Sequence, residues 1–179
     1  FLYHFTNENK DALVAVGFVI HLSYENPWMS PFDEFQRFKT HPHIKATFEG
    51  GKRLVYGARA INEGGLQSVP KLAFPGGALI GCSAGFVNLP RIKGSHNAMK
   101  TGMLAAEAAF DAVKTERQHD ELHAYNDGWK KSSVWTDLYK VRNVKPGLKW
   151  GMVLGSLHGG IHMWLNDLGL VKLVGWTLR

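Results

Sequence analysis

The first 24 residues alternate between apolar and polar stretches in the order that predicts a β-hairpin. Two runs rich in β-branched and aromatic residues, FLYHF and ALVAVGFVIHLSY, are separated by the polar stretch TNENKD. The pattern then changes to that of a helix. Ser30 can cap this helix, Pro31 suits its first position, and phenylalanines recur every three residues after it (Phe32, Phe35 and Phe38). The helix is expected to end before Pro42, because a proline disfavours helical geometry in the residue before it.

The centre of the chain combines short strand-like runs with two helical regions. Between residues 48 and 81, Gly-Gly pairs and prolines divide the sequence into short segments, and the last of them, GALIG, is expected to be a short buried strand. Residues 96–114 have an alanine-rich helical pattern, and residues 116–139 have a second one with a break near Gly128. The sequence VRNVKPG, at positions 141–147, is expected to be a loop.

The tail of the chain is apolar but lacks the pattern of a membrane-spanning helix. Residues 147–170 contain two formal charges, Lys149 and Asp167, besides two histidines. These polar residues argue against a span, and four interior glycines lower the helix propensity. Three tryptophans can anchor the segment at a membrane–water interface (Trp150, Trp164 and Trp176). We therefore expect the segment to lie in one leaflet, with membrane contacts made by Met152, Leu154 and Trp164.

The amino-acid composition indicates which kinds of binding partner this chain suits. Hydrophobic residues make up 45% and charged residues 20% of the 179, an ordinary balance for one globular domain or two small ones. The net charge of +6 suits an anionic membrane surface or an acidic partner. Basic clusters with interleaved aromatic residues are missing from the sequence, so no nucleic-acid partner is expected.

Two residue types bear on metal and redox chemistry. The one cysteine, Cys82, excludes an internal disulfide and a cysteine-ligated cluster within this chain. His158 and His162 are spaced like metal ligands on a helix, but no third ligand accompanies them. We expect no metal site there and favour a polar role at the membrane interface.

Residues 77–110 have the most distinctive pattern in the chain. A short apolar run leads into the small residues CSAG, then a proline and a basic loop, and then an alanine-rich helix. Small residues let a phosphate or ribityl chain approach the backbone, and a helix start offers free N–H groups. The alternative is a glycine-rich connection between strand and helix with no ligand, and physical reasoning alone leaves both interpretations open.

The spacing within this stretch resembles the late segment of FAD domains of the glutathione-reductase type. That segment reads approximately G-D-A-A-G, followed at intervals by Pro, Gly, Ala and Gly. The matching positions are Gly81, Ala84, Gly85, Pro90, Gly94, Ala98 and Gly102. Cys82 departs from the pattern, because it stands where an aspartate usually contacts the ribityl chain.

A narrower resemblance accounts for this departure. The stretches NPWMSPFDEFQRFKTHP, EGGKRLVYGARAINEGGLQSVPKLAFPGG, IGCSAGFVNLPRIKGSHNAMKTGMLAAE and VWTDLYKVRNVKP closely resemble the electron transfer flavoprotein–ubiquinone oxidoreductase family. In that family GC replaces GD. The resemblance implies FAD and a 4Fe-4S cluster as cofactors. It also implies electron transfer from reduced electron transfer flavoprotein to ubiquinone. The family works at a membrane lipid surface, as peripheral proteins of the bacterial or mitochondrial inner membrane.

The same resemblance implies that the chain is the middle of a longer enzyme. The first FAD-binding element would lie before Phe1, and the four cluster cysteines would lie after Arg179. The implied fold is a mixture of α+β and α/β. Residues 1–64 would be part of a β-rich ubiquinone-binding domain, residues 65–145 the C-terminal part of a glutathione-reductase-type FAD domain, and residues 146–179 a membrane-surface segment.

The resemblance assigns candidate site residues but no catalytic residue. Six would contact the cofactor (Gly81, Cys82, Ala84, Gly85, Gly94 and Ser95). Ser95 would lie near the flavin pyrimidine, although a serine at a helix start also commonly caps the helix. Phe32, Phe35 and Tyr56 would form walls of the quinone pocket, the alternative being ordinary core packing. A second function remains open, that of a membrane-surface or partner-binding module without its own redox cofactor.

Overall fold

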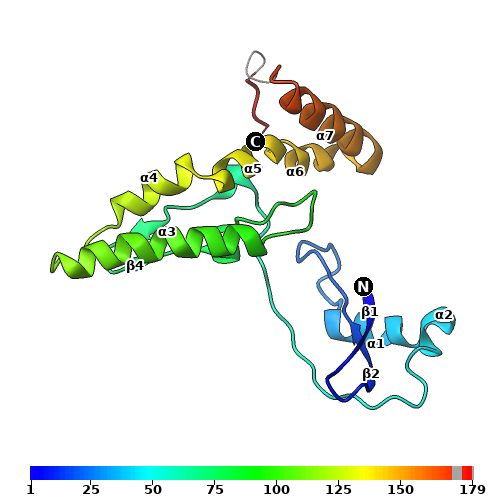
Figure 1. The fold of residues 1–179 in the computed structure, drawn as a ribbon. Coiled ribbons are helices and arrows are strands. Elements are labelled where there is room, and N and C mark those ends of the chain that lie inside the picture. Colours follow the sequence, from blue (N-terminus) through cyan, green and yellow to red (C-terminus); the bar gives the residue numbers. More distant parts are fainter. Residues whose placement is uncertain (171–174, 179) are drawn as a thin grey trace. The chain divides into compact units, whose positions relative to one another are not determined.

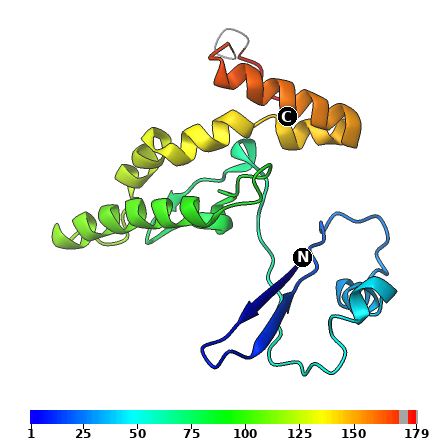
Figure 2. The same cartoon turned by 45° about the vertical axis from the view of Figure 1, so that its right-hand side comes forward.

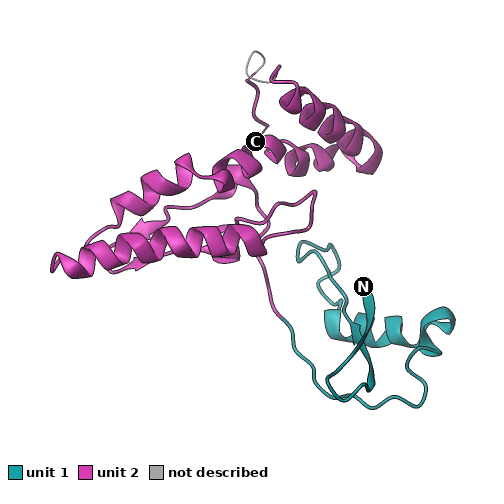
Figure 3. Cartoon of the chain, viewed as in Figure 1, with its two compact units in different colours: residues 1–58 teal, residues 59–179 magenta. Residues whose placement is uncertain are grey.

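The computed structural model describes residues 1–170 and 175–178, and the chain divides into two compact units (Figure 1). Unit 1 contains residues 1–58 and unit 2 contains residues 59–179 (Figure 3). Helices and very short strands are mixed in both. No helix among the described residues is both long and apolar enough to cross a membrane.

Unit 1 begins with the predicted hairpin. Strand β1 (Leu2–Thr6) pairs antiparallel with β2 (Ala12–Val16), as Figure 2 shows. The side chains of Asn7 and Asp11 close the turn: Asn7 Nδ2 donates to Asp11 Oδ2 at 2.8 Å, and the Asp11 N–H donates to Asn7 Oδ1 at 2.8 Å. The polar loop of the sequence therefore fixes the register of the hairpin through side-chain hydrogen bonds between its two ends.

The predicted helix of unit 1 is also confirmed. Helix α1 (Pro31–Lys39) starts after Ser30, whose hydroxyl accepts the Asp33 N–H at 3.2 Å, and it ends before the short helix α2 (Pro42–Lys45). The strands expected after residue 48 do not form in unit 1, where residues 51–58 have no regular structure. Unit 1 is therefore a hairpin with two helices rather than a β-rich domain.

Unit 2 is mainly helical. Two small strands pair antiparallel, β3 (Ala73–Phe74) with β4 (Gly77–Ala78). The longest helix, α3 (Ser95–Lys114), lies beside α4 (His123–Lys131) in Figures 1 and 2. The remaining helices are α5 (Ser133–Val141), α6 (Val144–Gly147) and α7 (Met152–Asp167), with 3-10 turns η1 (Leu66–Ser68), η2 (Gly81–Ala84) and η3 (Leu148–Trp150). Its buried core includes Leu72, Phe86, Tyr125, Trp129 and Leu138.

Three sequence-based expectations for unit 2 were wrong in detail. GALIG is a strand only at Gly77–Ala78, and Ile80 is 42% exposed. The second helical region breaks at Ser132, not at Gly128, because the Ser132 hydroxyl accepts the Val134 N–H at 3.2 Å and starts α5. The stretch expected to be a loop contains α6, which packs against α7.

Helix α7 forms in spite of its glycines, and one of these, Gly155, is required for packing. A Cβ atom at Gly155 would lie 2.6 Å from Leu148 Cα and 2.7 Å from the Gly147 carbonyl oxygen. Glycine therefore permits α7 to approach the end of α6 and the turn η3 at backbone distance. Gly160, on another side of α7, has open space around it.

The last described residues are tied back to the junction of α5 and α6. Asn143 donates to the Trp176 carbonyl at 3.0 Å and accepts the Leu178 N–H at 2.8 Å. Arg142 Nη2 donates to the same Trp176 carbonyl at 3.2 Å, and Gln67 Nε2 donates to the Leu178 carbonyl at 3.1 Å. Arg142 and Asn143 are buried, whereas their partners Trp176 and Leu178 are half-buried, and together these bonds form a clamp.

Candidate functional site

The glycine-rich stretch after β4 approaches helix α3 closely. Gly81 has a φ of +56°, and its N–H donates to Thr101 Oγ1 at 3.1 Å. A Cβ at Gly81 would lie 3.0 Å from the Cβ of Ala98. Gly85 ends the turn with a φ of +84°, and a Cβ atom there would have no other atom within 4 Å. Both positions therefore favour glycine, one for backbone conformation and close packing, the other for conformation alone.

A cavity of about 320 Å³ opens beside this turn within unit 2. It is lined by Asn62, Gly64, Ser68, Pro70, Ser83, Ala84 and Gly85. Asn62 Nδ2 donates to the Ser83 carbonyl at 3.3 Å, which joins the two segments that form the walls. The cavity brings the predicted cofactor residues Ala84 and Gly85 together with residues 62–70, which sequence reasoning did not assign. In the sequence, EGG at positions 63–65 and SVP at positions 68–70 predict turns, but they do not indicate a ligand.

Helix α3 begins without a capping side chain. Gly94 is its N-cap residue, and no side chain makes a cap hydrogen bond at this end. Ser95 is the first helical residue and is exposed, so the capping interpretation of Ser95 is not supported. The first-turn N–H groups thus keep their capacity to donate to an anionic or carbonyl oxygen. Gly94 itself packs on Val87, since a Cβ there would meet Val87 Cγ2 at 3.1 Å.

One carboxylate joins the loop before α3 to the first turn of α3. Asp137, on α5, accepts a hydrogen bond from Asn88 Nδ2 at 2.9 Å and from Arg91 Nη1 at 3.4 Å in the loop. It also accepts from Asn97 Nδ2 at 3.5 Å, and His96 Nε2 lies 3.4 Å from the same carboxylate. Burial raises the pKa of Asp137, but the hydrogen bonds and the Arg91 charge outweigh it, so the pKa lies below its usual range.

Cys82 is half-buried and has a free thiol in the turn η2. It lies in the same turn as the predicted cofactor residues Gly81 and Ala84.

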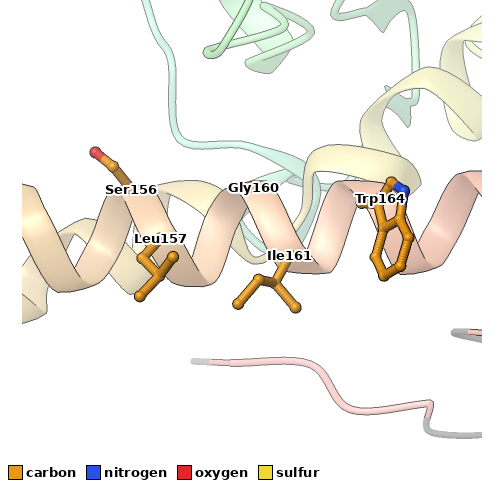
Figure 4. A pocket seen from close by; sticks show the side chains of 5 residues that line it. All are labelled: Ser156, Leu157, Gly160, Ile161 and Trp164. Atoms are coloured by element: carbon orange, nitrogen blue, oxygen red, sulfur yellow. The ribbon is translucent and has the colours of Figure 1, made fainter.

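Helix α7 exposes most of its apolar side chains and buries two of its three glycines, Gly155 and Gly159. Leu154, Leu157, Ile161 and Trp164, separated by three or four residues, form what we call the α7 apolar face, with exposed fractions from 49% to 63%. Figure 4 shows Leu157, Ile161 and Trp164 along α7, with Ser156 and Gly160 beside them in the lining of one hollow. A shallow hollow of about 340 Å³ lies along them at Gly160. Met152, the first residue of α7, is 83% exposed.

His162 lies on the buried side of α7, so the interfacial role expected for it was wrong. Its side chain is fully buried, and neither ring nitrogen has a hydrogen-bond partner among the described residues. Burial, with the nearby charges of Arg142 and His158, lowers the pKa of His162 to about 4, so the ring is neutral at pH 7. The ring stacks on His158 with centroids 6.1 Å apart. No group of three potential metal ligands occurs in the part of the chain that the structure describes.

The predicted quinone residues lie in unit 1. Phe35 packs on Phe18 with ring centroids 6.2 Å apart, as a core contact would. Phe32 and Tyr56 are 67% and 86% exposed, and Arg53 lies over the Tyr56 ring at 5.1 Å. Phe35 thus contributes to packing in unit 1, while the other two rings have surface available for further contacts.

Comparison with known proteins shows what this chain is similar to. The first 61 residues match the family model described as "ETF-QO, ubiquinone-binding". Over its whole length the chain is similar to proteins named as oxidoreductases. It is 54% identical over 186 residues to the mitochondrial electron transfer flavoprotein-ubiquinone oxidoreductase of Bos taurus, and 53% identical to that of Rattus norvegicus. A protein of Saccharomyces cerevisiae, named as a probable enzyme of this kind, is 46% identical over 197 residues.

These matches cover all of this chain, and the chain spans 29% to 30% of the length of the three relatives. The resemblance to the electron transfer flavoprotein–ubiquinone oxidoreductase family is therefore confirmed from one end of the chain to the other. Unit 1, residues 1–58, contains nearly all of the stretch that the ubiquinone-binding model matches.

Proposed function

We propose that this chain is the central segment of an enzyme that transfers electrons from reduced electron transfer flavoprotein to ubiquinone in a membrane. The observation that carries the proposal is the identity of 52% to 54% with five mammalian relatives of that name over the whole chain. The match of residues 1–61 to the ubiquinone-binding family supports the acceptor. We further propose residues 1–64 as part of the ubiquinone-binding domain, 65–145 as the C-terminal part of the FAD domain and 146–179 as the membrane-surface segment.

The turn η2 and the start of α3 fit a flavin cofactor. Gly85 contributes open backbone with positive φ to a cavity, and the α3 N-terminus has first-turn donors without a capping side chain. In the proposal Gly81, Cys82, Ala84 and Gly85 line the approach of the ribityl chain, and Gly94 and Ser95 lie at the pyrimidine edge. FAD, when bound, supplies the redox chemistry. The donors and positive dipole end of α3 stabilise negative charge beside it.

A 4Fe-4S cluster would need ligands from outside this chain, because Cys82 is the single cysteine of its 179 residues. In the proposal Phe32, Phe35 and Tyr56 belong to the quinone site. The α7 apolar face, with Met152, contacts the lipid surface, which places the enzyme peripherally on a bacterial or mitochondrial inner membrane.

The decisive experiment uses the full-length protein, with all the segments that its relatives contain. We expect one FAD per polypeptide by absorbance after acid release, four irons by elemental analysis, and reduction of ubiquinone by reduced electron transfer flavoprotein. A full-length protein that binds membranes but retains neither flavin nor iron would contradict the proposal and favour the alternative of a binding module without its own redox cofactor.

Ser95→Ala in the full-length protein should lower the flavin reduction potential while FAD is retained. The hydroxyl is exposed at the first residue of α3 and is not used as a cap, so it is free to stabilise charge on reduced flavin. A hydrogen bond to a charged group contributes about 1.5–3 kcal/mol, and part of this should appear in the potential. Spectroelectrochemical titration measures it. Ser133→Ala, at the first residue of α5, is the matched control and should leave the potential unchanged.

An equal shift in the Ser95 and Ser133 variants would contradict this role, as would an unchanged potential with full FAD content in the Ser95 variant.

A further inference from the structure

Asp137 occupies an unusual position among the carboxylates of unit 2. Its side chain is 17% exposed, and donors from two segments converge on it across 40 to 49 residues of sequence. The donors from the loop are Asn88 and Arg91, and those from the first turn of α3 are His96 and Asn97.

The loop donors are themselves fixed by bonds that make the arrangement rigid. Asn88 is fully buried, its Oδ1 accepts the Arg91 N–H at 3.2 Å, and its backbone pairs with Lys93. Asn97 is 2% exposed, and its Nδ2 also donates to the Phe86 carbonyl at 2.9 Å. Both ends of residues 86–97 therefore depend on buried amides whose donors are directed at one carboxylate.

We propose that Asp137 is a positioning residue that holds the turn before α3 and the first N–H groups of α3 in the geometry that the flavin requires. This inference rests on the proposed function in one respect, which is that the flavin binds at the N-terminal end of α3. Asp137 acts through Asn88 and Asn97 and does not itself contact the cofactor.

A carboxylate suits this role better than an amide. Ionised aspartate is an acceptor at both oxygens, so it can receive all of the converging donors at once. An asparagine in its place would present an N–H₂ group to Asn88, Asn97 or Arg91, which are also donors. At least one donor would then lose its partner, and the bonds that remain would no longer be made to a charged acceptor, which weakens them.

The first test compares Asp137→Asn with Asp167→Asn in the full-length protein. Asp167 is the control because it is also a carboxylate paired with a cation, Lys140 at 2.9 Å, but it lies on α7. Hydrogen–deuterium exchange of the flavin-free protein should show exchange at least about tenfold faster for the amides of residues 88–97 in the Asp137 variant and no change there in the control. FAD should also dissociate at least about tenfold faster from the Asp137 variant.

The second test separates positioning from the effect of charge. Asn88→Ala removes one anchor without changing the formal charge, so any shift in flavin potential reports geometry. We expect a roughly tenfold loss of preference for reduced over oxidised flavin, which is a fall of about 30 mV for a two-electron couple. Asp137→Glu, which keeps the carboxylate, should restore FAD retention at least in part.

The exchange measurement does not depend on FAD, so it distinguishes this inference from the proposed function. A full-length protein without flavin would overturn the proposed function even if residues 88–97 exchange faster. Unchanged exchange in the Asp137 variant, or faster exchange with FAD retention and potential both unchanged, would overturn the positioning role.

Discussion

Gly155→Ala should destabilise the protein, whereas Gly160→Ala, five residues along the same helix, should stabilise it. A methyl group at Gly155 would meet backbone atoms of Leu148 and Gly147 at 2.6 and 2.7 Å, and backbone cannot move aside as a flexible side chain can. Helix α7 would have to shift from α6, at a cost of about 1–3 kcal/mol. At Gly160 the methyl meets nothing, and alanine should gain about 0.5–1 kcal/mol of helix propensity.

Thermal unfolding of the two full-length variants, with local hydrogen exchange of α7, measures this difference. Because both substitutions are the same change in the same helix, differences in helix propensity cancel. Equal stability of the two variants would show that α7 does not pack on α6 through Gly155.

Replacing Met152, Leu154 and Trp164 together by serine should remove most liposome binding of the full-length protein. These side chains are 83%, 62% and 63% exposed, and an apolar surface of this kind gains free energy when it enters lipid. Full burial of such side chains contributes about 1.5–3 kcal/mol each. Even half of that from the three together corresponds to at least about a 40-fold loss in partitioning, since 1.4 kcal/mol is tenfold. Co-sedimentation with vesicles measures it.

Reduction of two quinones provides the control. A long-tailed ubiquinone dissolved in the vesicles should be reduced slowly by the triple variant, whereas a short-tailed, water-soluble analogue should be reduced at nearly the normal rate. Unchanged vesicle binding, with both rates unchanged, would show that α7 is covered by protein and that the membrane contact lies elsewhere. A fall in both rates would instead indicate a damaged electron-transfer site.

Elements with local signals were predictable from the sequence. The hairpin of unit 1 follows from an alternating pattern and a turn closed by Asn7 and Asp11, which are four residues apart. Helix α1 follows from Ser30 and Pro31, and α3 from its alanine-rich pattern. In each case the residues that decide the structure are neighbours in the chain.

Elements that depend on distant contacts were not predictable. The glycines of α7 lower helix propensity, and only the approach of α6 shows why Gly155 is needed. His162 was expected to be polar surface, but its face of α7 is the buried one. Asp137 is an ordinary polar residue in a helical pattern, because its partners come from up to 49 residues away.

The candidate flavin site was predictable only in part. The spacing of small residues from Gly81 to Gly102 indicated where the backbone approaches α3 closely, because such an approach requires small residues. The second wall of the cavity, formed by Asn62 and Ser68, has no such trace, since polar residues in a turn are common whether or not a ligand is present.

The clamp at Asn143 holds both ends of the segment that contains α7 at one place in unit 2. The chain leaves the body of the unit just after Asn143 and is bonded to it again at Trp176, so about thirty residues begin and end at the same place. An excursion with fixed roots can change in length or composition at little cost in closure entropy, as long as its contacts with α5, such as that of Asp167 with Lys140, are kept. Evolution could therefore adapt α7 to bilayers of different lipid content while the cavity beside η2 stays the same.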